Sequence, residues 1–168
     1  VFIGTAARNF DVKQFFRKWL RDMATEQRHD GALPHVVPVV GIGGWEWEHA
    51  NFCSGTAWAD AGVICPWQIY MAYGDKALLA EHLPMMKKWV EFMRHWGEEE
   101  SVFEGHFTYG DWLAMDGPAG SYHGISDHGL LSTAYYAYCV QLLVKAMEAL
   151  GEDPSEYRQL YARIVSAF

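Results

Sequence analysis

Residues 54–75 read Ser54-Gly-Thr-Ala-Trp-Ala-Asp-Ala-Gly-Val-Ile-Cys-Pro-Trp-Gln-Ile-Tyr-Met-Ala-Tyr-Gly-Asp75. This stretch predicts a helix that is entered through a loop of small residues, with Ser54 or Thr56 placed to cap its first turn. Gly74 can adopt the left-handed conformation that ends a helix, and Asp75 can cap the helix that follows. The stretch therefore predicts two consecutive helices joined by a tight turn.

Helices are also predicted on both sides of this stretch, from periodic apolar residues and from capping residues at their ends. One begins near Asp11, another covers residues 76–96, a third follows Asp127 and is stopped by Gly151, and the last follows Asp153. The residues expected to face the core are Phe15, Phe16, Trp19, Leu20 and Met23, then Leu79, Leu83, Met86, Val90 and Met93, then Leu131, Tyr135, Tyr138, Leu142 and Leu143, then Tyr157, Leu160, Tyr161, Ile164 and Phe168. The pattern predicts an all-α fold of about six helices in antiparallel hairpins.

The long connections between these helices carry aromatic residues that a core does not need. Trp45 and Trp47 lie in a glycine-rich loop over residues 41–53, and Trp112 and His123 lie in an irregular stretch over residues 101–125. Loops of this length in a compact helical domain are uncommon unless they bind something. Two interpretations stay open for Trp45 and Trp47: they line a binding cleft, or they cover the ends of the helices. If the long connections share one end of the molecule, their aromatic residues converge on one face, and these residues are Trp45, Trp47, Trp58, Tyr109 and Trp112.

Carboxylates next to tryptophans favour sugar recognition. Asp60 follows Trp58 by two residues, and Asp111 directly precedes Trp112. Indole rings cover the C–H faces of a sugar, and carboxylates accept hydrogen bonds from its hydroxyl groups. The alternative is that Asp60 satisfies backbone N–H groups at the helix terminus while Trp58 fills the core. Both interpretations stay open at this point.

Composition and charge exclude several classes of function. The formal net charge of −8 argues against nucleic acid or an anionic membrane as the main partner, because either would favour a basic face. No run approaches the ~18 apolar residues that a membrane span requires. Three widely spaced cysteines predict neither a disulfide framework nor a zinc cluster. His123 and His128 lack a partner at zinc-ligand spacing, so no metal is expected, and no phosphate-binding glycine loop indicates a cofactor.

The chain resembles a known family through a set of ordered motifs, which are Thr5-Ala-Ala-Arg-Asn-Phe-Asp11, Phe16-Arg-Lys-Trp-Leu-Arg-Asp22, Asp30-Gly-Ala-Leu-Pro34, Trp58-Ala-Asp-Ala61, Pro66-Trp67, Tyr73-Gly-Asp75, Gly110-Asp-Trp-Leu113 and Thr133-Ala-Tyr-Tyr136. The set resembles the catalytic domain of the bacterial α-L-rhamnosidases, which are six-hairpin glycoside hydrolases. The resemblance implies a partial (α/α)6 toroid, with residues 1–168 as a fragment of that single domain, roughly its first half. It implies inverting hydrolysis of a terminal α-L-rhamnose, and a rhamnose-containing glycoside or polysaccharide as the partner.

The resemblance also implies roles for individual residues. Trp58 and Trp112 match the family's tryptophans that pack around the bound rhamnose. Asp60 and Asp111 match carboxylates of the same motifs, for which a supporting or orienting role is expected. Trp45, Trp47 and His123 complete the expected substrate-binding set because they lie on the long loops and not because of the resemblance, since the loop over residues 41–53 is longer and richer in tryptophan than the family pattern. The general acid lies before residue 1 in the family pattern and the general base lies beyond residue 168, so we expect no catalytic residue here.

Two other functions are consistent with the same residues. The chain could belong to another (α/α)6 glycosidase, such as a trehalase-like or glucoamylase-like enzyme, or it could be a non-enzymatic helical module that binds carbohydrate or protein. A fragment of a toroid would leave apolar surface exposed, so we also expect the isolated chain to self-associate or to rearrange at its edge.

Overall fold

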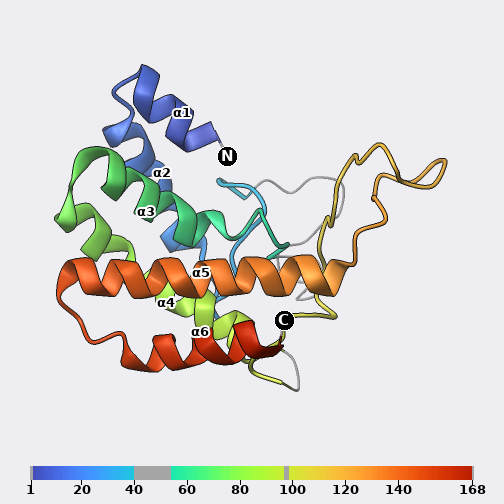
Figure 1. Cartoon of the computed structure of the whole chain (residues 1–168). Helices are drawn as coiled ribbons and strands as arrows, with labels where there is room; N and C mark the ends of the chain where they lie inside the picture. Colours follow the sequence, from blue (N-terminus) through green and yellow to red (C-terminus); the bar gives the residue numbers. More distant parts are fainter. Residues whose placement is uncertain (1, 40–53, 97–98, 168) are drawn as a thin grey trace.

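The computed structural model describes residues 2–39, 54–96 and 99–167 and consists of helices joined by loops (Figure 1). The helices are α1 (Phe2–Asn9), α2 (Lys13–Glu26), α3 (Ala61–Tyr73), α4 (Lys76–Arg94), α5 (His128–Leu150) and α6 (Ser155–Ala167). Within these ranges no β-strand forms, and only two isolated bridges connect loop residues. The prediction of an all-α fold is confirmed.

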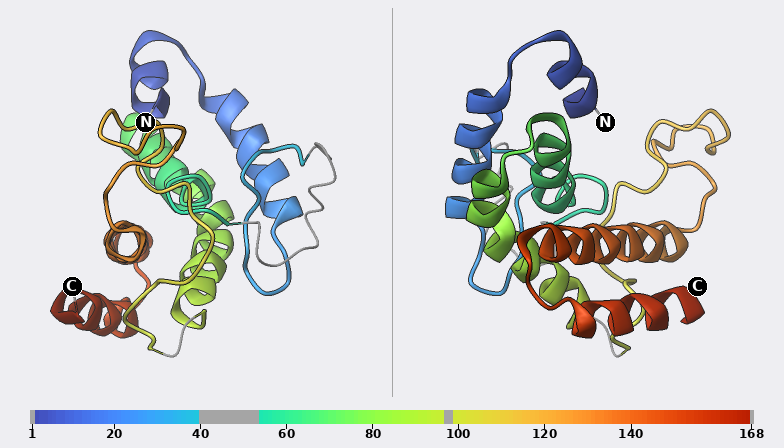
Figure 2. Two further views of the ribbon diagram at one scale, coloured as in Figure 1. Left: turned by 90° about the vertical axis from the view of Figure 1, so that its right-hand side faces the viewer. Right: turned by 60° about the vertical axis from the view of Figure 1, so that its left-hand side comes forward.

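From α3 onward, consecutive helices pack side by side as hairpins. α3 packs against α4, α4 against α5, and α5 against α6, while α1 and α2 pack against α3. Figure 2 shows the same order from two further directions. The turns that join α3 to α4 and α5 to α6 lie at one side of the molecule in Figure 1. The loop of residues 99–127 and the residues 54–60 that lead into α3 lie toward the opposite side. This arrangement brings the long loops together.

The turn signals were predicted correctly because they depend on local backbone conformation. Gly74 and Gly151 have φ values of 66° and 78°, in the left-handed region that ends a helix. Asp75 and Asp127 accept hydrogen bonds from backbone N–H groups three residues later, at 3.0 and 2.7 Å. These four positions fix the two hairpin turns and the start of α5.

The prediction that Ser54 or Thr56 caps α3 is wrong. The helix begins at Ala61, several residues further along. The hydroxyl of Ser54 instead bonds both the N–H and the carbonyl of Leu33, each at 2.9 Å. Thr56 donates to the hydroxyl of Ser132 on α5 at 3.0 Å. The two hydroxyls therefore tie the loop to the segment after α2 and to α5.

The core is built around α4. Its predicted stripe is confirmed, since the five expected residues are all buried: Leu79, Leu83, Met86, Val90 and Met93. The α5 stripe is partly wrong: Leu142 and Leu143 are buried, but Tyr138 is 39% exposed. Tyr136 is buried in place of its predicted neighbour Tyr135, because it packs on Phe103. On α2, Phe15 is exposed, whereas Leu20 and Met23 are buried.

No helix in the described part of the chain is both long and apolar enough to span a membrane.

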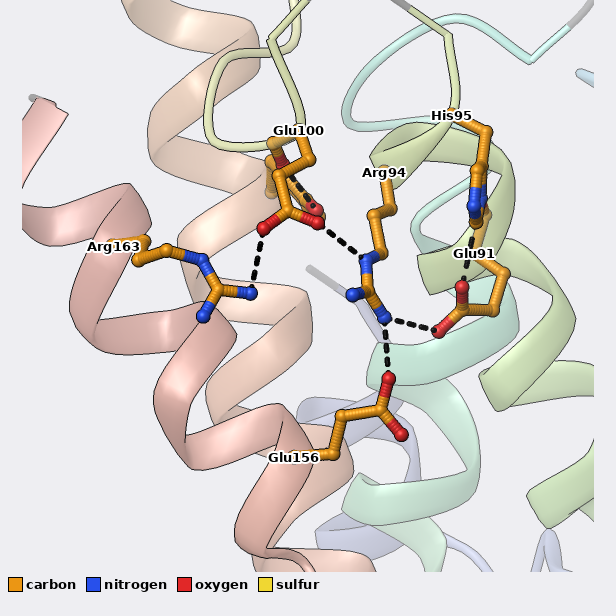
Figure 3. Close-up of polar contacts among 7 residues, drawn as sticks. Glu91, Arg94, His95, Glu100, Glu156 and Arg163 are labelled. Atoms are coloured by element: carbon orange, nitrogen blue, oxygen red, sulfur yellow. Dashed lines mark hydrogen bonds and ion pairs between the residues drawn. The ribbon is translucent and has the colours of Figure 1, made fainter.

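An ion-pair cluster centred on Arg94 joins the end of α4 to α6 (Figure 3). The Arg94 guanidinium contacts Glu156 on α6 at 2.6 Å, Glu100 at 2.9 Å and Glu91 at 3.6 Å. Arg163 on α6 contacts the second oxygen of Glu100 at 2.7 Å. Hydrogen bonds to Glu156 and then Glu100 raise the pKa of Arg94, so this side chain stays charged throughout the accessible pH range.

We expect Arg94→Met to lower the free energy of unfolding by about 1–2 kcal/mol, because it removes charge-assisted bonds from a side chain that is only 18% exposed. Arg158→Met is the matched control. It removes one exposed ion pair between α6 and Glu148 on α5, and should cost about 0.5 kcal/mol or less. Urea denaturation at low and high ionic strength checks the difference. Equal decreases in the free energy of unfolding of the two variants would show that the cluster stabilises the fold no more than a single surface ion pair does.

Candidate functional site

Three aromatic side chains from two distant loops form a continuous row, which we call the aromatic row: Trp58, Tyr109 and Trp112. The ring centroids of Trp58 and Tyr109 lie 4.3 Å apart, and those of Tyr109 and Trp112 lie 5.5 Å apart in edge-to-face geometry. Trp58 and Trp112 are 36% and 39% exposed, which is unusual for indole rings. The prediction that loop aromatics converge on one face is thus confirmed for these residues.

Backbone pairing holds the two loops together. Thr56 forms a parallel bridge with Thr108, which places Trp58 beside Tyr109. Trp112 forms an antiparallel bridge with His123, and the Leu113 N–H donates to the carbonyl of Tyr122 at 2.6 Å. The loop over residues 99–127 therefore folds back on itself, and it projects beyond the start of α5 in Figures 1 and 2.

Both tryptophans of the row lie next to a non-glycine residue in the left-handed region. Ala57 precedes Trp58 with φ of 69°, and Leu113 follows Trp112 with φ of 62°. Such a conformation costs about 1–3 kcal/mol and persists only where the surrounding structure imposes it. A strained backbone residue next to each tryptophan indicates that the surrounding structure holds both indole rings in place despite the strain, as is typical of binding sites.

Asp60 lies behind the row and is fully buried. One carboxylate oxygen accepts from the Ala57 N–H at 2.7 Å, and the other accepts from the Trp89 indole N–H at 2.8 Å and the Cys139 thiol at 3.2 Å. Burial raises the pKa of the Asp60 carboxyl, against these hydrogen bonds, which lower it. The carboxylate cannot reach a ligand in this structure. It holds the left-handed turn that presents Trp58, and Trp58 itself does not fill the core.

Asp111 is partly exposed beside the row. Its carboxylate accepts from the Ser126 hydroxyl at 3.0 Å, and its carbonyl accepts from the Gly124 N–H at 2.9 Å. A Cβ on Gly124 would lie 2.8 Å from the Asp111 carboxylate and 3.0 Å from that of Asp116. Only glycine lets the two acids approach this segment so closely. The structure thus places Asp111 directly before Trp112, with its carboxylate beside Ser126 and Gly124.

His123 also lies at the row. Its Nδ1 donates to the carbonyl of Tyr109 at 2.9 Å, because a carbonyl can only accept. Its ring contacts Trp112 at 5.4 Å and His128 at 5.3 Å between centroids. Trp45 and Trp47, the other expected substrate-binding residues, lie outside the described residues. Across the described ranges, no group of three or more His, Cys, Asp or Glu side chains could hold a metal ion.

Sequence reasoning missed His35 and left Tyr109 out of the expected binding set. His35 lies in the segment after α2, yet its Nδ1 lies 3.0 Å from the Tyr109 hydroxyl and its Nε2 accepts from the Gly55 N–H at 2.7 Å. A single histidine between two prolines belongs to no periodic pattern and to no motif of known spacing, so the sequence gives no reason to expect a functional role for it. Its partners are 20 and 74 residues away in the chain, so only the fold reveals the connection.

Comparison with known families agrees with this geometry. The family model described as the bacterial alpha-L-rhamnosidase 6 hairpin glycosidase domain matches residues 1–168. The chain belongs to this family. The resemblance noted in the sequence is therefore confirmed, and the helical hairpins are the expected fold of a rhamnosidase domain of the six-hairpin type.

Individual rhamnosidases resemble the chain over its whole length. An alpha-L-rhamnosidase of Streptomyces avermitilis is 34% identical over 172 residues, which is 100% of this chain and 15% of that protein. One from Formosa agariphila is 34% identical over 170 residues, which is 17% of its length. The crystal structure of the Streptomyces avermitilis enzyme complexed with L-rhamnose superposes with a TM-score of 0.83 at 32% identity, covering 99% of this chain and 14% of that one. The chain thus spans about a sixth of the rhamnosidases that it matches.

Proposed function

We propose that this chain is part of the catalytic domain of an α-L-rhamnosidase, and that the aromatic row is one wall of its sugar site. Residues 1–168 would form part of a single (α/α)6 domain, of which the packed hairpins are consecutive members. The observation that carries the proposal is the convergence of Trp58 and Trp112 on one exposed face, on both sides of Tyr109. A similar protein has been crystallised as a complex with L-rhamnose.

The row suits a deoxyhexose. L-Rhamnose carries a methyl group and C–H faces that stack on indole rings, and hydroxyl groups that need hydrogen-bond partners. Trp58 and Trp112 supply the apolar surface and exclude water. Asp111 and His123 lie at the same loop end and can bond sugar hydroxyls. Asp60 contributes from behind by holding the turn that presents Trp58.

The proposed reaction is hydrolysis with inversion. One carboxylic acid protonates the leaving oxygen while a carboxylate activates water on the opposite face of the sugar, which requires two carboxyl groups about 6.5–9.5 Å apart. We place both groups outside residues 1–168, on the resemblance to the family. Within this chain, Asp60 is fully buried and Asp111 lies beside an indole as a binding group, so neither is assigned proton transfer.

The proposal predicts that the complete protein containing this chain releases rhamnose from an aryl α-L-rhamnoside, and that residues 1–168 alone do not. Absorbance of the released phenol measures the rate, and proton NMR of the first-formed sugar identifies its anomer. Inversion gives the β-anomer first. Preference for glucosides over rhamnosides would favour the trehalase-like or glucoamylase-like alternative. Turnover by residues 1–168 alone would contradict the placing of the catalytic carboxylates.

Self-association of the isolated chain stays a prediction. Apolar side chains are exposed along the loop that carries Trp112, with Leu113 64%, Met115 101% and Ile125 73% exposed. Exposed apolar residues gathered on one segment support contact with another surface.

A further inference from the structure

The hydrogen bonds of His35 fix its protonation and its tautomer. A backbone N–H can only donate, so the bond from Gly55 to Nε2 at 2.7 Å requires a lone pair on Nε2. The ring is therefore neutral and carries its proton on Nδ1. That proton points at the Tyr109 hydroxyl, whose oxygen lies 3.0 Å from Nδ1. His35 thus donates to Tyr109, and Tyr109 accepts.

This direction determines what the Tyr109 hydroxyl can do. Because its oxygen accepts from His35, its own proton must point elsewhere. Among the described residues, the Tyr109 hydroxyl makes no hydrogen bond other than the one with His35. Partial burial raises the pKa of Tyr109, so the phenol keeps its proton at neutral and moderately alkaline pH. The hydroxyl is a donor of fixed orientation that lacks a protein acceptor in the described part of the chain.

The ring that carries this hydroxyl is the centre of the aromatic row. Trp58 lies against one part of the ring at 4.3 Å between centroids, and Trp112 meets it edge-on at 5.5 Å. A Cβ on Gly55 would lie 3.4 Å from the Tyr109 ring and 3.0 Å from His35 Nε2, so the backbone also closes around this pair. These contacts hold the ring in place, and the bond accepted from His35 makes the hydroxyl proton point away from Nδ1.

We propose that Tyr109 is a further substrate-binding residue whose hydroxyl donates a hydrogen bond to the 2-, 3- or 4-hydroxyl oxygen of the sugar, and that His35 is the positioning residue that sets the direction of this donor. The inference rests on the proposed function, because it places the sugar against the aromatic row. A preorganised donor loses little rotational freedom on binding and discriminates against sugars that lack the matching hydroxyl.

The test uses inhibition of aryl rhamnoside hydrolysis in the complete protein, with L-rhamnose and its 2-, 3- and 4-deoxy analogues as inhibitors. Tyr109→Phe removes only the hydroxyl. We expect it to weaken inhibition by L-rhamnose about 3- to 10-fold, as for one neutral hydrogen bond. One deoxy analogue, the one that lacks the partner hydroxyl, should inhibit the wild type and Tyr109→Phe equally. Tyr138→Phe, on α5 outside the row, is the matched control and should change no inhibition constant.

Two variants of His35 test its positioning role. His35→Phe removes both bonds, and should weaken inhibition by L-rhamnose at least as much as Tyr109→Phe. His35→Asn keeps a donor near the Nδ1 position, and should recover part of that loss. When Tyr109→Phe is also present, L-rhamnose should inhibit the His35→Asn variant no better than the His35→Phe variant, because the hydroxyl oxygen that would accept from the asparagine amide has been removed. Recovery that persists without the Tyr109 hydroxyl would overturn the role assigned to His35.

The outcomes separate the inference from the proposed function. If the wild type cleaves rhamnosides and Tyr109→Phe leaves every inhibition constant unchanged, the inference is overturned and the proposed function stands. An equal loss for L-rhamnose and all three deoxy analogues would also overturn it, since no single sugar hydroxyl would be the partner. If the wild type cleaves no rhamnoside, the proposed function fails and the inference fails with it.

Discussion

Replacing Trp112 with alanine is expected to weaken inhibition by L-rhamnose about 30-fold or more, while the free energy of unfolding falls by about 1 kcal/mol or less. The indole is 39% exposed and its contacts are to other loop residues, namely Tyr109, Tyr122 and His123. Removing it therefore costs the fold little. A bound sugar would lose most of the apolar surface on that side. Trp58→Ala should behave in the same way, with the double variant showing no measurable binding.

Trp67→Ala provides the contrast for these variants. Trp67 lies on α3 and packs against the hydrophobic core and Tyr70, outside the aromatic row. Its replacement should lower the free energy of unfolding by about 3 kcal/mol and leave the inhibition constant unchanged. Inhibition titrations and urea denaturation on the three variants give two independent readouts. A stability loss of similar size in Trp112→Ala, with unchanged inhibition, would identify Trp112 as a structural residue.

Replacing Asp60 with alanine is expected to lower the free energy of unfolding by about 3 kcal/mol or more, because two buried donors lose their acceptor. These are the indole N–H of Trp89 and the thiol of Cys139, two side chains with no exposed surface. The part-buried N–H of Ala57 loses its acceptor as well. Asp60→Asn keeps one acceptor oxygen but turns an amide N–H toward a donor, and should cost about 1–3 kcal/mol. Asp116→Asn, at an exposed acid, is the control and should stay within about 0.5 kcal/mol of the wild type.

Asp60 also gives the stability a distinctive pH dependence. Its pKa is raised in the folded protein, mainly by burial, above the ordinary value of 3.8. At a pH between the ordinary pKa and the raised pKa of the folded protein, Asp60 is more protonated in the folded chain than in the unfolded chain. The contribution of Asp60 to the free energy of unfolding therefore decreases as pH rises. Asp60→Asn lacks this contribution. Urea denaturation across pH should show the wild type losing stability relative to Asp60→Asn as pH increases above about 4. A constant difference would show that the pKa of Asp60 is not raised.

The sequence predicted those features that depend on neighbouring residues. Gly74 and Asp75 identify a turn because left-handed glycine and an aspartate cap act within one helical turn. The α4 stripe was predicted because polar residues clearly separate its apolar positions. On α5, apolar and aromatic residues occur on nearly every side, so periodicity did not distinguish buried Tyr136 from the more exposed Tyr135 and Tyr138.

The site depends on contacts that no local pattern encodes. Adjacent acids and indoles suggested a binding role for Asp60, but its burial follows from Trp89 and Cys139, which are 29 and 79 residues away. The same limit applies to His35, whose partners are Gly55, 20 residues along the same connection, and Tyr109, on another loop 74 residues away. Convergence of Trp58 and Trp112 could be predicted, because hairpins with alternating short and long connections place the long ones at one end.

The most direct test of the sugar site is fluorine NMR of the complete protein labelled with 5-fluorotryptophan, with Trp→Phe variants to assign the resonances. The account predicts that L-rhamnose shifts the resonances of Trp58 and Trp112 and leaves that of buried Trp89 unchanged. Binding of L-rhamnose with both row resonances unmoved would contradict it.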